Sequence, residues 1–106
     1  MALLDETARG VFVIAVTPFD DRGALDLESL DRVTDFYLGA GADGLTILGM
    51  MGEAPKLTHA EALQVIDRVV ARAKSVPVVV GVSAPGLAAL GELGKVTYTV
   101  EPSGLV

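Results

Sequence analysis

Three short apolar runs divide the chain at nearly equal intervals. They cover residues 11–16, 44–49 and 77–82, and their ends recur about every 33 residues. Each run is separated from the next by one segment with apolar residues at helical spacing. Strands that alternate with single helices form βαβ units, and right-handed crossovers make such strands parallel. The sequence therefore predicts an α/β fold on a parallel sheet. The first run, VFVIAV, is continuously apolar, which predicts a strand buried on both faces.

Two helices are predicted between these runs. The first covers residues 26–38, with Gly39 and Gly41 available to end it. The second begins at Thr58-His59-Ala60-Glu61, the Thr-x-x-Glu pattern in which each side chain caps the backbone N–H of the other residue. It ends before Pro77, because the residue ahead of a proline avoids helical geometry. Its predicted inner face consists of Leu63, Ile66, Val69, Val70 and Ala73.

The end of the chain departs from this pattern. In a helix interior, Gly91 and Gly94 would each lower the stability of the helix by about 1 kcal/mol relative to alanine. Residues 95–100 alternate apolar and polar side chains, as a half-exposed strand does, and the final EPSGLV reads as a turn followed by two apolar residues. A complete barrel of eight βα units needs roughly 200–250 residues. The 106 residues here supply three such units and a remainder.

Composition excludes several classes of function. The net charge is −6, and the basic residues are scattered singly, so no basic stripe predicts nucleic-acid binding. The chain has no cysteine, which excludes disulfides and zinc–thiolate sites. The N-terminus carries acidic residues in place of the positive charge of a signal peptide, and no apolar run is long enough to span a bilayer. We expect a soluble cytoplasmic protein that has no nucleic-acid or membrane partner.

Three loops are candidates for a functional site, because ligands bind at the carboxyl ends of parallel strands. The first is Thr17-Pro18-Phe19, the second is Gly49-Met50-Met51-Gly52-Glu53, and the third covers residues 81–86.

The same loops carry a family resemblance. The stretches AVTPFDDRGALDLESL, GADGLTILGMMGEAPKLTHAE and VPVVVGVSAPG resemble, in order and spacing, the N-terminal third of the dihydrodipicolinate synthase and N-acetylneuraminate lyase family. The resemblance implies the fold class α/β, a partial (β/α)8 TIM barrel of about the first three βα units plus an atypical C-terminal strand. Residues 1–90 would be the N-terminal part of a TIM-barrel aldolase domain, and residues 91–106 an atypical tail, frame-shifted or truncated.

The resemblance also implies a chemistry. Members of the family are class I aldolases, in which a lysine on the sixth strand forms a Schiff base with pyruvate or a related 2-oxo acid. The imine then accepts electrons while a C–C bond is made or broken, which requires a lysine held neutral and donors for the substrate carboxylate. In the family those donors belong to a Gly-x-x-Gly-Glu turn, commonly with two threonines between the glycines. No cofactor or metal is implied.

Here Met50 and Met51 stand where the threonines would be. The backbone N–H groups of the turn remain, but the hydroxyl proton relay is lost. This argues against dihydrodipicolinate synthesis itself and favours another 2-oxo acid or a sugar acid, with the methionines shaping a softer pocket. The alternative is that adjacent methionines at a strand end only fill the core.

The predicted substrate-binding residues are Gly49, Met50, Met51, Gly52, Glu53, Thr17 and Ser83. Each has a structural alternative: Glu53 is a solvated or capping carboxylate, Thr17 only ends its strand, and Ser83 caps a helix near Pro85. No catalytic residue is predicted, because Lys56, Lys74 and Lys95 cannot be matched to the sixth-strand lysine and read as surface charges. His59 falls inside the helix cap, so no catalytic dyad or metal cluster is built on it.

Three hypotheses follow. The chain is an incomplete Schiff-base lyase that is inactive alone, an enzyme completed by another chain, or a non-catalytic binding or assembly module that associates through open sheet edges. The first two imply a small 2-oxo acid as partner, and the last two imply self-association or a completing chain.

Overall fold

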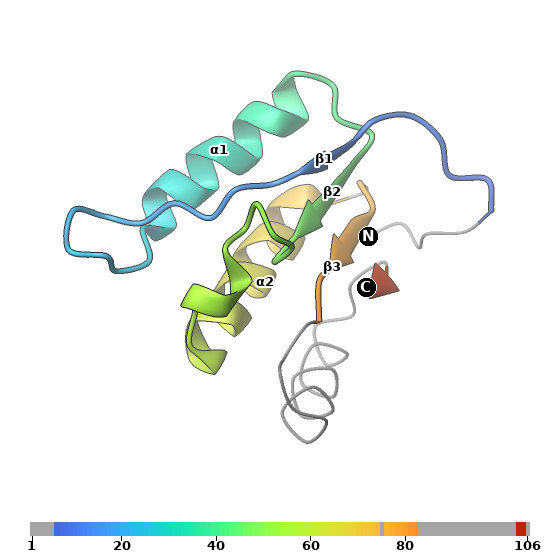
Figure 1. Ribbon diagram of the computed structural model, residues 1–106. Helices are drawn as coiled ribbons and strands as arrows, with labels where there is room; N and C mark the ends of the chain where they lie inside the picture. Colours follow the sequence, from blue (N-terminus) through green and yellow to red (C-terminus); the bar gives the residue numbers. More distant parts are fainter. Residues whose placement is uncertain (1–5, 75, 83–103, 106) are drawn as a thin grey trace.

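The computed structural model describes residues 6–74, 76–82 and 104–105 (Figure 1). The elements follow the order β1 (Phe12–Ile14), α1 (Leu27–Gly39), β2 (Gly44–Ile47), a 3₁₀ turn η1 (Ala54–Lys56), α2 (His59–Ala73), β3 (Val78–Val80) and β4 (Gly104–Leu105). The strands form one sheet in the order β1-β2-β3-β4, and every neighbouring pair is parallel. The predicted α/β fold with a parallel sheet is therefore confirmed.

The core lies between the sheet and the two helices. Leu45 and Ile47 of β2 stand in register with Val78 and Val80 of β3, so the four side chains share one face of the sheet. All four are at most 2% exposed and belong to one apolar cluster with residues from both helices. This face fixes the position of the strands, whose carboxyl ends carry the predicted site.

Strand β1 differs from its prediction. The expectation of a strand buried on both faces over residues 11–16 is wrong: β1 covers Phe12–Ile14, and Val11 and Ile14 are 66% and 56% exposed. Among the described residues β1 pairs only with β2, and the helices cover one face of the sheet, on which Ala15 is buried. The opposite face of β1 therefore has no described neighbour above it. In the third run, by contrast, Val78, Val79 and Val80 are all buried.

Helix α1 begins and ends on short polar signals. The Asp26 side chain accepts a hydrogen bond from the Ser29 backbone N–H at 3.0 Å, which caps the N-terminus. At the other end Gly41 has φ +95° and donates its N–H to the Leu38 carbonyl. The predicted glycine terminator is thus confirmed at Gly41, where a left-handed backbone favours glycine.

Helix α2 confirms the predicted capping box. The Thr58 hydroxyl accepts from the Glu61 N–H at 3.1 Å, and the Glu61 carboxylate accepts from the Thr58 N–H at 2.9 Å. Its fully buried residues are Ala62, Val65, Ile66, Val69 and Ala73, whereas Leu63 and Val70 of the predicted face are only partly buried. The buried stripe is therefore rotated slightly from the predicted one and includes Ala62 and Val65 in place of Leu63 and Val70.

Residues 104–105 form a fourth strand, β4, at a position where no strand was predicted. Gly104–Leu105 pairs with β3 in the register Val79↔Gly104 and Val80↔Leu105. The strand predicted over residues 95–100 lies outside the described residues. No helix in the described part of the chain is long and apolar enough to cross a membrane.

Candidate functional site

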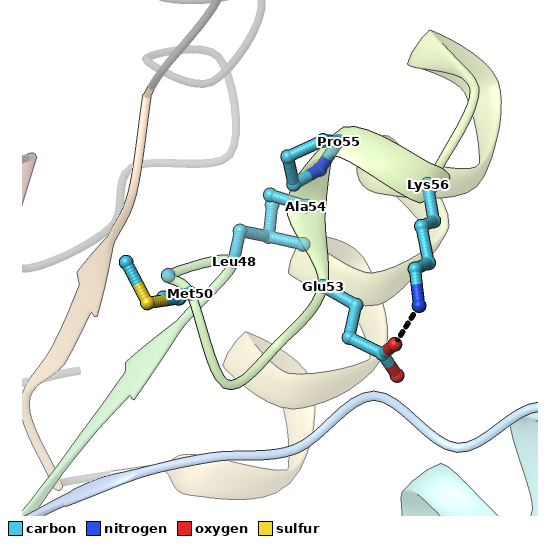
Figure 2. Close-up of a pocket in the computed structure, with 7 residues that line it drawn as sticks. Leu48, Met50, Glu53, Ala54, Pro55 and Lys56 are labelled. Carbon is cyan, nitrogen blue, oxygen red and sulfur yellow. Dashed lines mark hydrogen bonds and ion pairs between the residues drawn. The ribbon is translucent and has the colours of Figure 1, made fainter.

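The turn after β2 forms a pocket at the carboxyl end of the sheet. Its volume is about 520 Å³. Figure 2 shows the side chains around it, which come from the turn after β2 and from η1. The lining residues are Leu48, Gly49, Met50, Glu53, Ala54, Pro55 and Lys56. Three predicted site residues, Gly49, Met50 and Glu53, are therefore brought together in one hollow.

The two methionines lie outside the core of the described chain. Met50 is 93% exposed and Met51 is 58% exposed. Met50 also lines the pocket, as Figure 2 shows, whereas Met51 does not. Within the described residues, the interpretation of this pair as core filler is therefore wrong.

The backbone of the turn offers hydrogen-bond donors. The turn closes through the Glu53 N–H, which donates to the Met50 carbonyl at 3.1 Å. The N–H groups of Met50, Met51 and Gly52 donate to no acceptor among the described residues. Successive unpaired N–H groups in a tight turn form a concave site that attracts anions. Such a turn can hold a carboxylate without any side-chain hydroxyl.

Glu53 adopts a left-handed backbone conformation, with φ +54°. Its carboxylate pairs with the Lys56 ammonium at 2.5 Å, and its carbonyl accepts from the Lys56 N–H at 2.9 Å. The dashed line in Figure 2 marks the side-chain pair. These two bonds connect the turn to η1, while the contact of Glu53 with a substrate stays a prediction.

Thr17 reaches the turn from the end of β1. It is 5% exposed, and its Oγ1 lies 3.3 Å from the position that a Cβ on Gly52 would occupy. The structure therefore brings Thr17 and Gly52 together beneath the turn. Ser83 lies outside the described residues, so its predicted role stays a prediction.

Two further residues at this end of the sheet were not among the predicted substrate-binding residues, although Gly81 begins the third candidate loop. Leu48, directly after β2, is buried at 3% exposure and has φ +57°. Gly81, directly after β3, lies against the Leu48 backbone. A glycine at the end of a strand can indicate that another backbone segment approaches closely. Gly81, which follows the three valines of β3, could have been interpreted in this way.

The strongest electrostatic interactions lie away from the pocket, between α1 and α2. Arg68 donates two hydrogen bonds to the Asp31 carboxylate, at 3.1 and 2.9 Å, and Arg72 binds Asp35 in the same bidentate manner. Hydrogen bonding to Arg68 holds the pKa of Asp31 below its usual value, and hydrogen bonding to Arg72 does the same for the pKa of Asp35. These pairs hold the helices together rather than preparing a group for acid–base chemistry.

A metal site is not formed by the described residues, which include no group of three His, Cys, Asp or Glu side chains placed to hold an ion. The chemistry available at the pocket is therefore that of backbone donors, one apolar wall and the Glu53–Lys56 pair.

Comparison with known proteins agrees with this geometry. The chain is 34% identical over 97 residues to 4-hydroxy-tetrahydrodipicolinate synthase 2 of Halalkalibacterium halodurans, covering 91% of the chain and 33% of that protein. The crystal structure of dihydrodipicolinate synthase from Rhodopseudomonas palustris superimposes with a TM-score of 0.91 at 48% identity, over 99% of this chain and 35% of that one.

A further structure is the chloride-inhibited dihydrodipicolinate synthase from Acinetobacter baumannii complexed with pyruvate. It matches with a TM-score of 0.88 and 28% identity, over 93% of this chain and 34% of that one. The chain thus spans about a third of the length of these relatives. The sequence model of the Dihydrodipicolinate synthetase family matches residues 7–104, which includes all three strand-end loops and most of the segment after residue 90. The chain belongs to the dihydrodipicolinate synthetase family.

Proposed function

We propose that this chain supplies the carboxylate-binding turn of a lyase or aldolase that acts on pyruvate or another 2-oxo acid through a Schiff base. The observation that carries the proposal is the turn after β2, where the N–H groups of Met50, Met51 and Gly52 have no acceptor among the described residues. A carboxylate placed over them would accept charge-assisted hydrogen bonds, which are stronger than neutral ones. The pyruvate complex of the Acinetobacter baumannii relative supports the substrate class.

The sheet is proposed to be the first part of a (β/α)8 barrel. In the described residues β1 and β4 each have only one neighbouring strand, and the relatives that match are about three times longer. On this proposal the exposed face of β1, with Ile14 and Val16, faces the barrel interior. The division at residue 90 into a barrel part and an atypical tail stays a prediction, and the family match runs across it.

The Schiff-base lysine is proposed to lie elsewhere in the enzyme. A lysine nucleophile must be held neutral, by burial or by neighbouring cations. Lys56 has the opposite surroundings, because its side chain is 70% exposed and paired with Glu53. Lys74 is exposed and follows α2, far along the chain from the turn. Neither lysine fits the role, and Lys95 lies outside the described residues.

The methionines bear on the identity of the substrate. Met50 presents an exposed thioether at the pocket, where a threonine would present a hydroxyl. A flexible apolar side chain accommodates an apolar substituent and transfers no proton. We therefore favour a reaction other than dihydrodipicolinate synthesis, on another 2-oxo acid or a sugar acid, and pyruvate serves in the tests as the smallest 2-oxo acid probe.

Amide chemical shifts test the proposal directly. During titration with pyruvate we expect saturable shifts of the Met50, Met51 and Gly52 resonances, and much smaller shifts with pyruvamide, which lacks the carboxylate charge. Met51→Pro removes one donor and should weaken binding, whereas Met50→Leu keeps every donor and should not. Equal responses to pyruvate and pyruvamide would contradict a carboxylate site.

Borohydride reduction in the presence of pyruvate tests the location of the lysine. With the protein isolated from its native source, we expect an adduct that peptide mapping places outside Lys56 and Lys74. An adduct on either residue would refute this part of the proposal.

A second candidate function is assembly through the open edge of the sheet. It is favoured by the exposure of Val11, Ile14 and Val16 along β1, which are 66%, 56% and 38% exposed. A concentration-dependent dimer in analytical ultracentrifugation, without any response to 2-oxo acids, would favour assembly over catalysis. A monodisperse monomer at high concentration would exclude it.

A further inference from the structure

Leu48 stands in an unfavourable backbone conformation at the start of the turn. Its φ of +57° lies in the left-handed region, and a leucine there is strained because its Cβ crowds the backbone. Its side chain is 3% exposed, so burial anchors the residue. A strained backbone persists only where the surrounding structure enforces it. The neighbours of Leu48 should therefore show what enforces it.

Gly81, the residue after β3, packs closely against the Leu48 backbone. A Cβ added to Gly81 would lie 2.3 Å from the Leu48 carbonyl oxygen, 2.9 Å from its carbonyl carbon and 3.3 Å from the Gly49 nitrogen. The Gly81 N–H also donates to the Ile47 carbonyl at 2.8 Å. Only a residue without a side chain permits this approach. Since Gly81 is not among the positive-φ glycines, the requirement is for space rather than for an unusual dihedral.

Gly52 closes on Leu48 from the turn itself. A Cβ on Gly52 would lie 3.0 Å from the Leu48 nitrogen and 3.2 Å from its Cα. The same position is 3.3 Å from Thr17 Oγ1. The Leu48 backbone is thus enclosed between two glycines, and Thr17, three residues after β1, lies close to Gly52. The segments that follow β1, β2 and β3 therefore meet around this one residue.

We propose that Gly81 is a positioning residue for the carboxylate-binding turn. By admitting the backbone that follows β3 against the Leu48 carbonyl, it holds Leu48 left-handed. That conformation directs the turn out over the sheet, with the N–H groups of Met50, Met51 and Gly52 unpaired among the described residues. The role of the turn in binding rests on the proposed function, whereas the control of its shape by Gly81 does not. A residue at the end of the neighbouring strand, β3, thus determines where the backbone donors of the turn point.

The test compares two Gly→Ala variants in the same chain. Gly81→Ala adds a methyl group against the Leu48 carbonyl. Gly39→Ala adds the same group in α1, where no atom lies within 4 Å of it. Amide chemical shifts of Met50, Met51 and Gly52, measured without ligand, report the shape of the turn. We expect Gly81→Ala to move them and Gly39→Ala to leave them in place.

Pyruvate affinity is measured on the same samples. We expect Gly81→Ala to lose about tenfold or more, because misplaced donors lose most of their effect. Turn amides that stay in place in Gly81→Ala would overturn the inference. If the amides move and neither the parent nor the variant binds pyruvate, the positioning role stands and the proposed function fails.

A second variant covers the case in which Gly81→Ala does not fold. With glycine at position 48 the peptide can rotate, so the carbonyl can move away from the new methyl group. Leu48→Gly also removes a buried side chain, so the single Leu48→Gly variant is the reference. We expect Gly81→Ala to cost less unfolding free energy in the Leu48→Gly background than in the parent chain, and an equal or larger cost would overturn the inference.

Discussion

The helix-covered face of the sheet and the turn after β2 are built in opposite ways. On the covered face Leu45, Ile66, Val78 and Val80 are completely buried, and both helices begin with side-chain caps. In the turn, Met50 is 93% exposed, three N–H groups are unpaired among the described residues, and Leu48 is strained. The helix-covered region buries its apolar side chains and caps its helix ends within the chain, whereas the turn exposes its side chain and its N–H groups.

The difference teaches where stability and binding are located in this chain. Burial of apolar surface on the covered face provides the free energy that holds the strands in register. The turn gives up some of that free energy through its strain and exposure, which is tolerable because the sheet beneath it is rigid. Substitutions should therefore separate into those that unfold the chain and those that alter only the turn.

The largest expected effect comes from the centre of the core. Ile66→Ala should lower the free energy of unfolding by about 2–5 kcal/mol, because Ile66 is fully buried and the cavity refills only partly. Met50→Ala, which removes a side chain of similar size, should change it by less than about 0.5 kcal/mol. Urea denaturation measures both. Equal losses of unfolding free energy in the two variants would contradict the difference between the core and the turn.

A smaller effect is expected at the start of α2. Thr58→Ala should cost about 1 kcal/mol of unfolding free energy, because the Glu61 N–H loses its acceptor. Thr58→Ser keeps the hydroxyl oxygen and serves as the matched control. Thermal unfolding followed by circular dichroism compares the two variants, and a serine variant as unstable as the alanine variant would argue against the cap.

Acid should weaken the contact between α1 and α2. Asp31 and Asp35 have pKa values lowered in the folded chain by hydrogen bonds from Arg68 and Arg72. Their contribution is therefore complete above the unfolded pKa of about 3.8 and is lost as the pH falls through their lower folded values. Asp31→Asn/Asp35→Asn should flatten the dependence of stability on pH in that range.

The acid effect should be small, since the pairs are partly exposed to solvent and screened by salt. It should not disappear completely in the double variant, because the pKa of Asp26 is also lowered, chiefly by the hydrogen bond from the Ser29 backbone. Urea denaturation at a series of pH values measures the unfolding free energy of the parent and of the double variant. If this free energy changes with pH as steeply in the double variant as in the parent, the ion pairs do not have the proposed role.

The smallest effect on stability should come from oxidation of the turn. Hydrogen peroxide converts a methionine thioether to the sulfoxide and is itself reduced to water. Met50 should react faster than Met51, because it is 93% against 58% exposed. Peptide mass spectrometry measures the two rates, and the unfolding midpoint should stay where it was. Faster reaction at Met51 would show that the turn is shaped differently.

Much of the architecture could be predicted from local patterns. The βαβ spacing predicts the parallel sheet, and the Thr58–Glu61 capping box and Gly41 mark helix ends at short range. The position of the turn also follows, because Gly49 to Glu53 directly succeed an apolar run. These features depend on neighbours within a few residues, which is what a sequence pattern records.

The details of the site could not be predicted in this way. The contact between Leu48 and Gly81 joins two residues that are 33 positions apart in the sequence. The exposure of Ile14 depends on which face of the sheet the helices cover. Likewise, the short strand β4 is a strand only because β3 offers it a partner. None of these leaves a periodic signal.

The sequence by itself determined the alternation of strands and helices, the caps, and the family to which the chain belongs, because each is written in the type and spacing of nearby residues. Only the tertiary structure decided that Met50 is exposed, that the turn donors are unpaired among the described residues, and that Leu48 is held between Gly52 and Gly81. Those properties arise when the ends of three strands are brought to one edge of the sheet, and the distances among them exist only after packing.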